Sequence, residues 1–112
     1  MSDDIRAVLG DPAPPEAPRI GPVLEEVYSV LEQRKAEPSE ESYTAKLLVG
    51  PQDKLLKKVA EEASEVIIAA RDHDPEQLRW EIGDLIYHVL VVMLREGMTL
   101  EDLASELASR RR

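Results

Sequence analysis

The sequence predicts an all-α protein, a bundle of four helices in one domain of 112 residues. Between residues 23 and 107, apolar side chains recur at intervals of three and four residues, which is the spacing of one helix face. No segment alternates apolar and polar residues as a half-buried strand does, and no internal repeat is present. Proline marks the boundaries of the periodic segments, at Pro38, Pro51 and Pro75.

The N-terminal part, residues 1–20, is expected to be a flexible proline-rich tail, and residues 21–112 are expected to form the all-α domain. Five of the eight prolines fall within the first 22 residues, and proline interrupts a helix. The first helix is predicted from Val23 until shortly before Pro38.

The next elements are set by short capping signals. Residues 39–50, SEESYTAKLLVG, are expected to form a polar loop with one helical turn. A second helix is predicted from Pro51 to about Arg71, because proline suits the first turn of a helix.

Capping signals also bound the last two helices. Asp74, Pro75 and Gln77 form an N-cap, a proline at the first position and a capping partner, which open a third helix that extends to Glu96. Gly97 is placed to end it. A fourth helix with Leu100, Leu103 and Leu107 is predicted to follow a second capping pattern, Thr99 with Asp102.

The overall composition excludes several classes of function. The formal net charge of −9 disfavours binding to nucleic acid or to an anionic membrane. The absence of cysteine excludes disulfides and thiolate metal sites. No apolar run reaches the ~20 residues that span a bilayer, and the first residues lack the pattern of a signal peptide, so a cytoplasmic protein is expected.

The charged face of the second helix is unusual. It carries lysines followed by acids: Lys54, Lys57, Lys58, Glu61, Glu62, Glu65 and Asp72. Such a stripe is commonly a solvated face with Lys–Glu pairs. However, Ile68 falls inside it, and Glu61, Glu62 and Glu65 cluster although like charges repel at this spacing. Some positive charge should compensate these acids.

The third helix places two more acids in an apolar setting. Residues 85–94, LIYHVLVVML, are apolar nearly all the way round, so this helix is expected to be buried on every side. Glu81 and Asp84 lie three residues apart at its start and point the same way. Burying ionised carboxylates without partners costs several kcal/mol each.

A bound divalent cation is the compensation that we predict, because hard cations such as Mg²⁺ take carboxylate oxygens and leave positions for water and phosphate. Glu62 and Glu65 would face Glu81 and Asp84 around it, with Glu61 as a supporting group, a ligand of a second ion or a base. Lys–Glu pairing between the helices is the alternative, and for Glu81 the helix dipole is another.

The pattern Glu-Glu-x-x-Glu followed by Glu-x-x-Asp resembles the signature of the all-α, MazG-like nucleoside triphosphate pyrophosphatases. With SYTAKL before KLLKKVAEEASE and with EIGDLIYH behind, residues 23–107 resemble the phosphoribosyl-ATP pyrophosphatase family. The resemblance implies a MazG-like bundle completed by homodimerisation and Mg²⁺-dependent hydrolysis of phosphoribosyl-ATP to phosphoribosyl-AMP and pyrophosphate, the second step of histidine biosynthesis. It also implies metal ligands at Glu62, Glu65, Glu81 and Asp84, with Glu61 as the catalytic residue that supports the metal or the attacking water.

The candidate substrate contacts are cations, hydroxyls and one histidine: Lys46, Lys54, Lys57, Lys58, Ser42, Tyr43, Thr44 and His88. The lysines could bind phosphates, although Lys54 and Lys58 could equally pair with acids one turn away. The hydroxyls could bind substrate or simply be solvated. His88 could orient Asp84, touch substrate, or be a satisfied core residue.

Two other functions use the same residues. A MazG-like enzyme that removes pyrophosphate from noncanonical or deoxynucleoside triphosphates would have the same five acids. A helical dimerisation module with a degenerate acidic face would need no catalysis, although all five acids of the signature are present.

Overall fold

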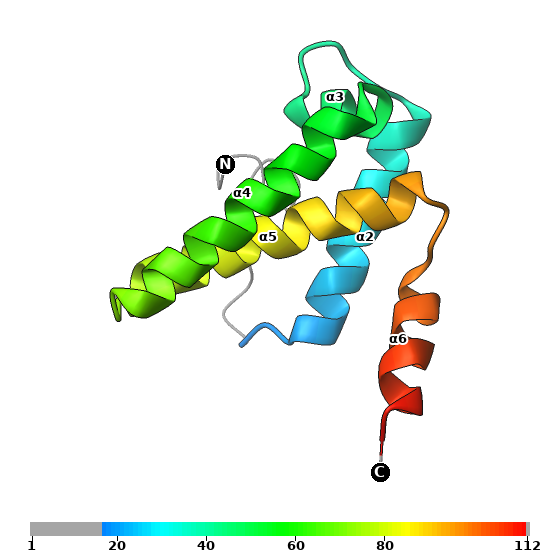
Figure 1. Ribbon diagram of the computed structural model, residues 1–112. Helices are drawn as coiled ribbons and strands as arrows, with labels where there is room; N and C mark the ends of the chain where they lie inside the picture. Colours follow the sequence, from blue (N-terminus) through cyan, green and yellow to red (C-terminus); the bar gives the residue numbers. More distant parts are fainter. Residues whose placement is uncertain (1–16, 112) are drawn as a thin grey trace.

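The computed structural model describes residues 17–111, and this part of the chain is all-α, as predicted (Figure 1). Its helices are α2 (Ile20–Ala36), α3 (Tyr43–Val49), α4 (Gln52–Arg71), α5 (Pro75–Arg95) and α6 (Leu100–Ser109). The expected tail, residues 1–20, lies outside the described residues apart from residues 17–20, and α2 already begins at Ile20.

The described residues form five helices rather than the predicted four, because the expected loop at residues 39–50 contains α3. The side chain of Ser42 caps α3 by accepting a hydrogen bond from the backbone N–H of Ala45 at 3.2 Å. Ala45, Leu47 and Leu48 are then buried. The prediction of a polar loop with one turn was wrong because this burial stabilises a helix too short to persist alone.

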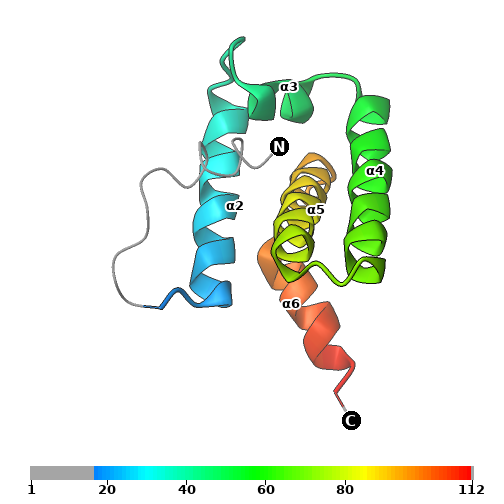
Figure 2. The ribbon, with the colours of Figure 1, turned by 90° about the vertical axis from the view of Figure 1, so that its left-hand side faces the viewer.

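The longest helices, α4 and α5, form an antiparallel hairpin with the most extensive contact between any two elements. Figure 2 shows α5 between α2 and α4, with α3 bridging the other two at one end. The turn between α4 and α5 contains His73 in the left-handed region, with φ of 53°. The predicted N-cap and first-position proline are confirmed: Asp74 accepts from the N–H of Gln77 at 3.1 Å, and Pro75 begins α5. The predicted capping partner is not, because the side chain of Gln77 donates to Glu81 rather than to the backbone of Asp74.

The core lies where α2, α3 and α4 meet α5, and Leu31, Leu55 and Val91 are completely inaccessible there. The hydroxyl of Tyr28 on α2 donates to the carbonyl of Met98, which fixes the connection after α5. The predicted capping box of Thr99 and Asp102 then opens α6, which has no buried residue.

The expectation that α5 is buried on every side was wrong for this single chain. Ile82, Ile86 and Val89 are 39%, 37% and 38% exposed. Their spacing of four and three residues places them on one stripe, which the other described helices cover only in part. An apolar stripe of this kind remains available for a partner.

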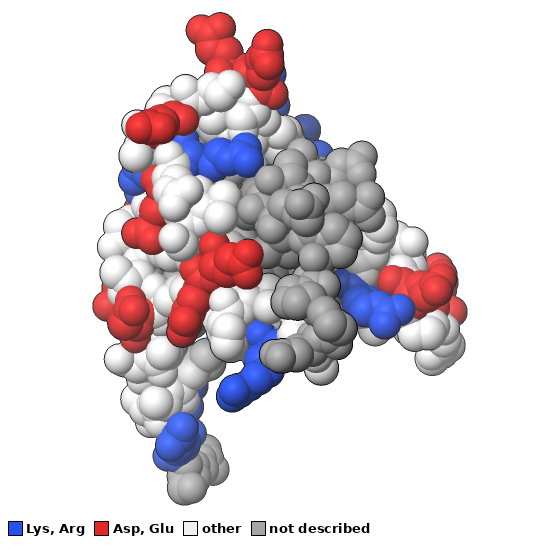
Figure 3. All heavy atoms as spheres, turned by 180° about the vertical axis from the view of Figure 1, so that it is seen from behind, with Lys and Arg blue, Asp and Glu red and all other residues white. Residues whose placement is uncertain are grey.

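The described surface carries charge of both signs. In the face seen in Figure 3, the Lys and Arg side chains stand apart from one another rather than joining into a basic patch. No helix among residues 17–111 is long and apolar enough to cross a membrane.

Candidate metal centre

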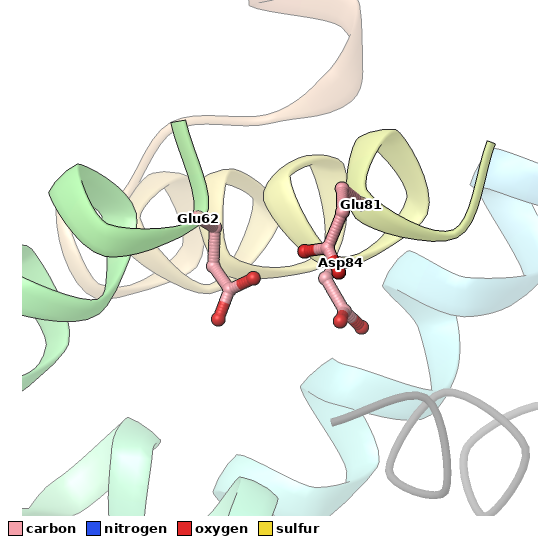
Figure 4. A group of neighbouring side chains, drawn as sticks. All are labelled: Glu62, Glu81 and Asp84. Carbon is pink, nitrogen blue, oxygen red and sulfur yellow. The ribbon is translucent and has the colours of Figure 1, made fainter. Parts of the chain in front are cut away.

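Three buried acids meet across the α4–α5 hairpin. Glu62 comes from α4, and Glu81 and Asp84 come from α5. They are 2%, 6% and 1% exposed, and one carboxylate oxygen of each lies within 4.8 Å of the others. Figure 4 shows all three side chains on the same side of the helix pair. The grouping follows from local sequence, because residues three apart on a helix share a face and α4 faces that part of α5.

Buried oxygens in this group lack hydrogen-bond partners. The Oε2 atoms of Glu62 and Glu81 are inaccessible and accept no hydrogen bond. Glu81 uses its Oε1 to accept from Nε2 of Gln77 at 2.6 Å. An unsatisfied buried acceptor costs about 1–3 kcal/mol, and more when it is charged. Folding alone gives no reason to retain these carboxylates.

The acids also shift one another's pKa values. Burial, followed by the neighbouring acids Glu65, Asp84 and Glu81, raises the pKa of Glu62 from 4.5 to about 7. A hydrogen bond shared by Glu65 and Glu81 raises the pKa of Glu81, and burial adds to this. The same bond lowers the pKa of Glu65. The cluster therefore holds protons that a divalent cation would displace.

A divalent ion such as Mg²⁺ fits this set of donors. All the donors are carboxylate oxygens, which hard cations prefer. Two of these oxygens, Oε2 of Glu62 and Oε2 of Glu81, have no hydrogen-bond partner among the described residues. Neither Glu62 nor Glu81 forms an ion pair with a described Lys or Arg. The alternative of Lys–Glu pairing between the helices therefore does not account for these two acids.

The other two predicted acids lie outside the buried group. Glu65 is exposed and reaches Glu81 at the edge of the cluster. Glu61 is also exposed and pairs with Lys58, whose Nζ lies 3.4 Å from its Oε2. The structure thus brings Glu62, Glu65, Glu81 and Asp84 together, whereas Glu61 stands beside them on the outer face of α4.

The hydroxyls and the histidine predicted as substrate contacts instead join α3 to its neighbours. The hydroxyls of Thr44 and Tyr87 are hydrogen-bonded. The hydroxyl of Tyr43 lies 3.2 Å from Nε2 of His88, whose Nδ1 lies 2.7 Å from the carbonyl oxygen of Asp84. Because a carbonyl only accepts, Nδ1 carries a proton, and the ring packs edge-on to Tyr87.

The remaining candidates differ in accessibility. Ser42 accepts from Nη1 of Arg34 at 3.3 Å in addition to capping α3. Lys46, Lys54 and Lys57 are exposed, so their ammonium groups are accessible to an anionic ligand. The structure does not gather these lysines into the buried group of acids.

Two residues whose side chains make long-range or site contacts were missed from the sequence. Gln77 was assigned only to capping, yet it also binds Glu81, and its position one turn before Glu81 was a usable signal. Arg95 donates from Nη1 to the carbonyls of Leu47 and Gly50, at 2.8 and 2.7 Å, and so holds the end of α3. Nothing in the local sequence indicates that contact.

Comparison with known proteins gives a consistent result. The family model described as phosphoribosyl-ATP pyrophosphohydrolase matches residues 24–111. A phosphoribosyl-ATP pyrophosphatase from Lactiplantibacillus plantarum is 45% identical over 87 residues, which are 78% of this chain and 82% of that protein. A protein of the same name from Clostridium botulinum (strain Hall) is 47% identical over 89 residues, 80% of this chain and 81% of that protein.

A longer relative matches over part of its length. The histidine biosynthesis bifunctional protein HisIE of Bacillus subtilis is 46% identical over 94 residues, which are 84% of this chain and 44% of that protein. The family model, which matches residues 24–111, includes α3 to α6 and therefore the whole group of buried acids. The chain belongs to the phosphoribosyl-ATP pyrophosphohydrolase family.

Proposed function

We propose that this protein hydrolyses phosphoribosyl-ATP between its α and β phosphates. The products are phosphoribosyl-AMP and pyrophosphate, and the reaction is the second step of histidine biosynthesis. The observation that carries the proposal is the buried group of Glu62, Glu81 and Asp84, in which the Oε2 atoms of Glu62 and Glu81 accept no hydrogen bond from the described residues, in a chain of this family. Folding does not require this group, whereas a polyphosphate hydrolase that depends on a metal does.

The metal is Mg²⁺ in this proposal, and Glu62, Glu65, Glu81 and Asp84 hold it. Their oxygens supply a hard-cation site, and the inaccessible Oε2 atoms of Glu62 and Glu81 support it. When bound, Mg²⁺ neutralises charge on phosphate oxygens and makes water more acidic.

The chain's own side chains position the reactants and move a proton. Glu61 is exposed beside the buried acids, and we assign it the role of the base that takes a proton from the attacking water at its carboxylate. Lys58 pairs with Glu61 and can hold that carboxylate in position. The accessible ammonium groups bind phosphate oxygens of the substrate: Lys46, Lys54, Lys57 and Lys58.

The contacts of α3 with α5 serve the site indirectly. The hydrogen bonds of Ser42, Tyr43 and Thr44 hold α3, which carries Lys46. His88 donates from Nδ1 to the carbonyl of Asp84 and so fixes the turn from which that carboxylate projects. In this proposal these four residues position substrate-binding groups.

The active protein is a homodimer in this proposal. A second copy would cover the exposed stripe of Ile82, Ile86 and Val89, which one chain leaves in water. A charged, phosphorylated substrate of a biosynthetic pathway also supports a cytoplasmic location.

The test is pyrophosphate release by the purified protein, with Mg²⁺ or with a chelator. The substrates are phosphoribosyl-ATP and a panel of nucleoside and deoxynucleoside triphosphates. Mg²⁺-dependent release from phosphoribosyl-ATP alone is the expected result. Release from the panel instead would assign the protein to nucleotide clearance, and no release from any substrate would favour a dimerisation module.

A further inference from the structure

A cavity adjoins the buried acids on the side of the turn between α4 and α5. Its volume is about 280 Å³. Glu65 and Glu81 line the part next to the metal centre, and Asp72, Asp74 and Gln77 line the part next to the turn. Pockets that enclose a whole ligand usually measure ~300–1,000 Å³, so this one suits only a portion of a large nucleotide.

The charge at the turn end of the cavity, away from the proposed metal ligands, is unfavourable for a phosphate group. Asp72 and Asp74 line this end, and no Lys or Arg of residues 17–111 lines the cavity. Asp72 is the C-cap of α4, where the helix dipole disfavours a negative charge. A carboxylate at this position does not help the helix, and it instead makes the cavity attractive to a cation.

The wall between the two ends is apolar. Ile68 lies in the charged stripe of α4 and is 54% exposed, and the side chain of Ala69 beside it is buried. An apolar wall with carboxylates at its edge suits a flat ring that carries positive charge. The buried Oε2 of Glu81, which accepts no hydrogen bond, marks the edge that continues into the metal centre.

The proposed substrate contains such a ring. In phosphoribosyl-ATP the additional phosphoribosyl group is attached to N1 of adenine. A substituent at N1 makes the ring much more basic, so that it is cationic at neutral pH. The adenine of ATP lacks the substituent and is neutral. The two nucleotides therefore differ in charge at the base itself.

The order of side chains along α4 indicates how the bound substrate is oriented along this helix. Lysines come first, at Lys54, Lys57 and Lys58, the acids follow, and Ile68 and Asp72 come last. At about 1.5 Å per residue, Lys58 and Asp72 are about 21 Å apart along the helix axis. The terminal phosphates can lie toward the lysines, the α phosphate beside the acids, and the base toward the turn.

We infer that the cavity at the α4–α5 turn binds the cationic, N1-substituted adenine ring, and that Asp72 and Asp74 discriminate phosphoribosyl-ATP from ATP. This inference rests on the proposed function and adds its specificity. Ile68 supplies the surface on which the ring lies. The two aspartates supply negative charge, which attracts the cationic ring but not the neutral adenine of ATP.

The first experiment compares small probes with the native protein in Mg²⁺. N1-methyl-AMP carries the cationic ring, AMP is the reference, and N6-methyl-AMP is the neutral isomer with the same methyl group. Each is titrated by calorimetry and as a competitor of phosphoribosyl-ATP. N1-methyl-AMP is expected to bind about tenfold more tightly than the other two, as a charge-assisted contact implies. Equal affinities would overturn the inference.

The second experiment replaces the aspartates. The variants are Asp72→Asn, Asp74→Asn and the double variant; asparagine preserves the N-cap of α5 at position 74. Each single change is expected to raise KM for phosphoribosyl-ATP about three- to tenfold with kcat nearly unchanged, and the double variant should lose the preference for N1-methyl-AMP. Asp53→Asn, an equal charge change in the first turn of α4, is the control and should change neither quantity.

Two outcomes would contradict the inference without affecting the proposed function. One is a double variant with an unchanged KM. The other is a double variant that needs more Mg²⁺ but keeps its preference among the probes, which would assign the aspartates to a second ion. Failure of the native protein to release pyrophosphate would instead refute the proposed function, while calorimetry with the probes still tests the cavity.

Discussion

Two sets of polar side chains join α5 to its neighbours, one set to α3 and the other to α4, and they differ in how their hydrogen bonds are satisfied. The contacts between α3 and α5 pair Thr44 with Tyr87 and Tyr43 with His88. The group of buried acids, by contrast, leaves the Oε2 atoms of Glu62 and Glu81 without a donor. The first set can be explained by folding, because its groups satisfy one another. The second is not explained in this way, because two of its oxygens have no partner among the described residues.

The largest expected effect comes from neutralising one acid of the metal centre. Glu62→Gln should lower pyrophosphate release by about 10²-fold or more, because several kcal/mol of charge stabilisation by the metal are lost. The same variant should be at least as stable as the native protein without metal, because it removes a buried carboxylate with an unsatisfied oxygen. Activity assays and urea unfolding in EDTA measure the two effects. A variant that unfolds while the native protein stays folded would make Glu62 a structural residue.

The pH dependence of stability should reveal the contribution of the buried acids, through Glu62. The pKa of Glu62 rises from 4.5 to about 7 on folding, so the folded state keeps a proton that the unfolded state releases. Ionisation of Glu62 should therefore cost the metal-free protein about 3 kcal/mol of stability as the pH rises from about 4.5 to 7, with no further loss from this group above 7.

Urea unfolding in EDTA at several pH values from 4.5 to 8 would measure this change. Glu62→Gln serves as the control and should have a flatter profile. Mg²⁺ should stabilise the native protein more at pH 8 than at pH 5.5, because it competes with the proton. A native profile as flat as that of the variant would contradict the assignment.

A double-mutant cycle would test the paired set. Thr44→Val should cost about 1–3 kcal/mol of unfolding free energy, because the buried Tyr87 hydroxyl loses its Thr44 partner. Tyr87→Phe should cost a similar amount for the same reason. The double variant should cost less than the two changes added together, which urea unfolding can measure. Strict additivity would mean that this hydrogen bond contributes nothing.

The smallest expected effect concerns Tyr43, which is half-buried and contacts His88. Tyr43→Phe removes the hydroxyl beside His88 and should cost about 0.5–1.5 kcal/mol. Since His88 also bonds the carbonyl of Asp84, activity should fall by a few-fold, far less than for Glu62→Gln. Loss of activity as large as that of Glu62→Gln would place Tyr43 in direct contact with substrate.

Local signals predicted most of the fold correctly. Asp74 with Gln77 and Thr99 with Asp102 act within one helical turn, so the start of α5 and the start of α6 could be predicted from the sequence. The relation of Glu81 to Asp84 is equally local, because a spacing of three on a helix sets a shared face. The complete burial expected for α5 failed at Ile82, Ile86 and Val89, because hydrophobicity does not specify which chain covers a surface.

The sequence by itself determined the caps, the apolar periodicity of the helices and the two acidic motifs, since each depends on residues at most a few positions apart. The tertiary structure decided the extent of α3, whose seven residues need burial against neighbouring helices to stay helical. It also decided which acids are buried: Glu62 faces α5, whereas Glu61, about 100° away around α4, faces solvent. That distinction depends on the position of a second helix, which no local pattern encodes.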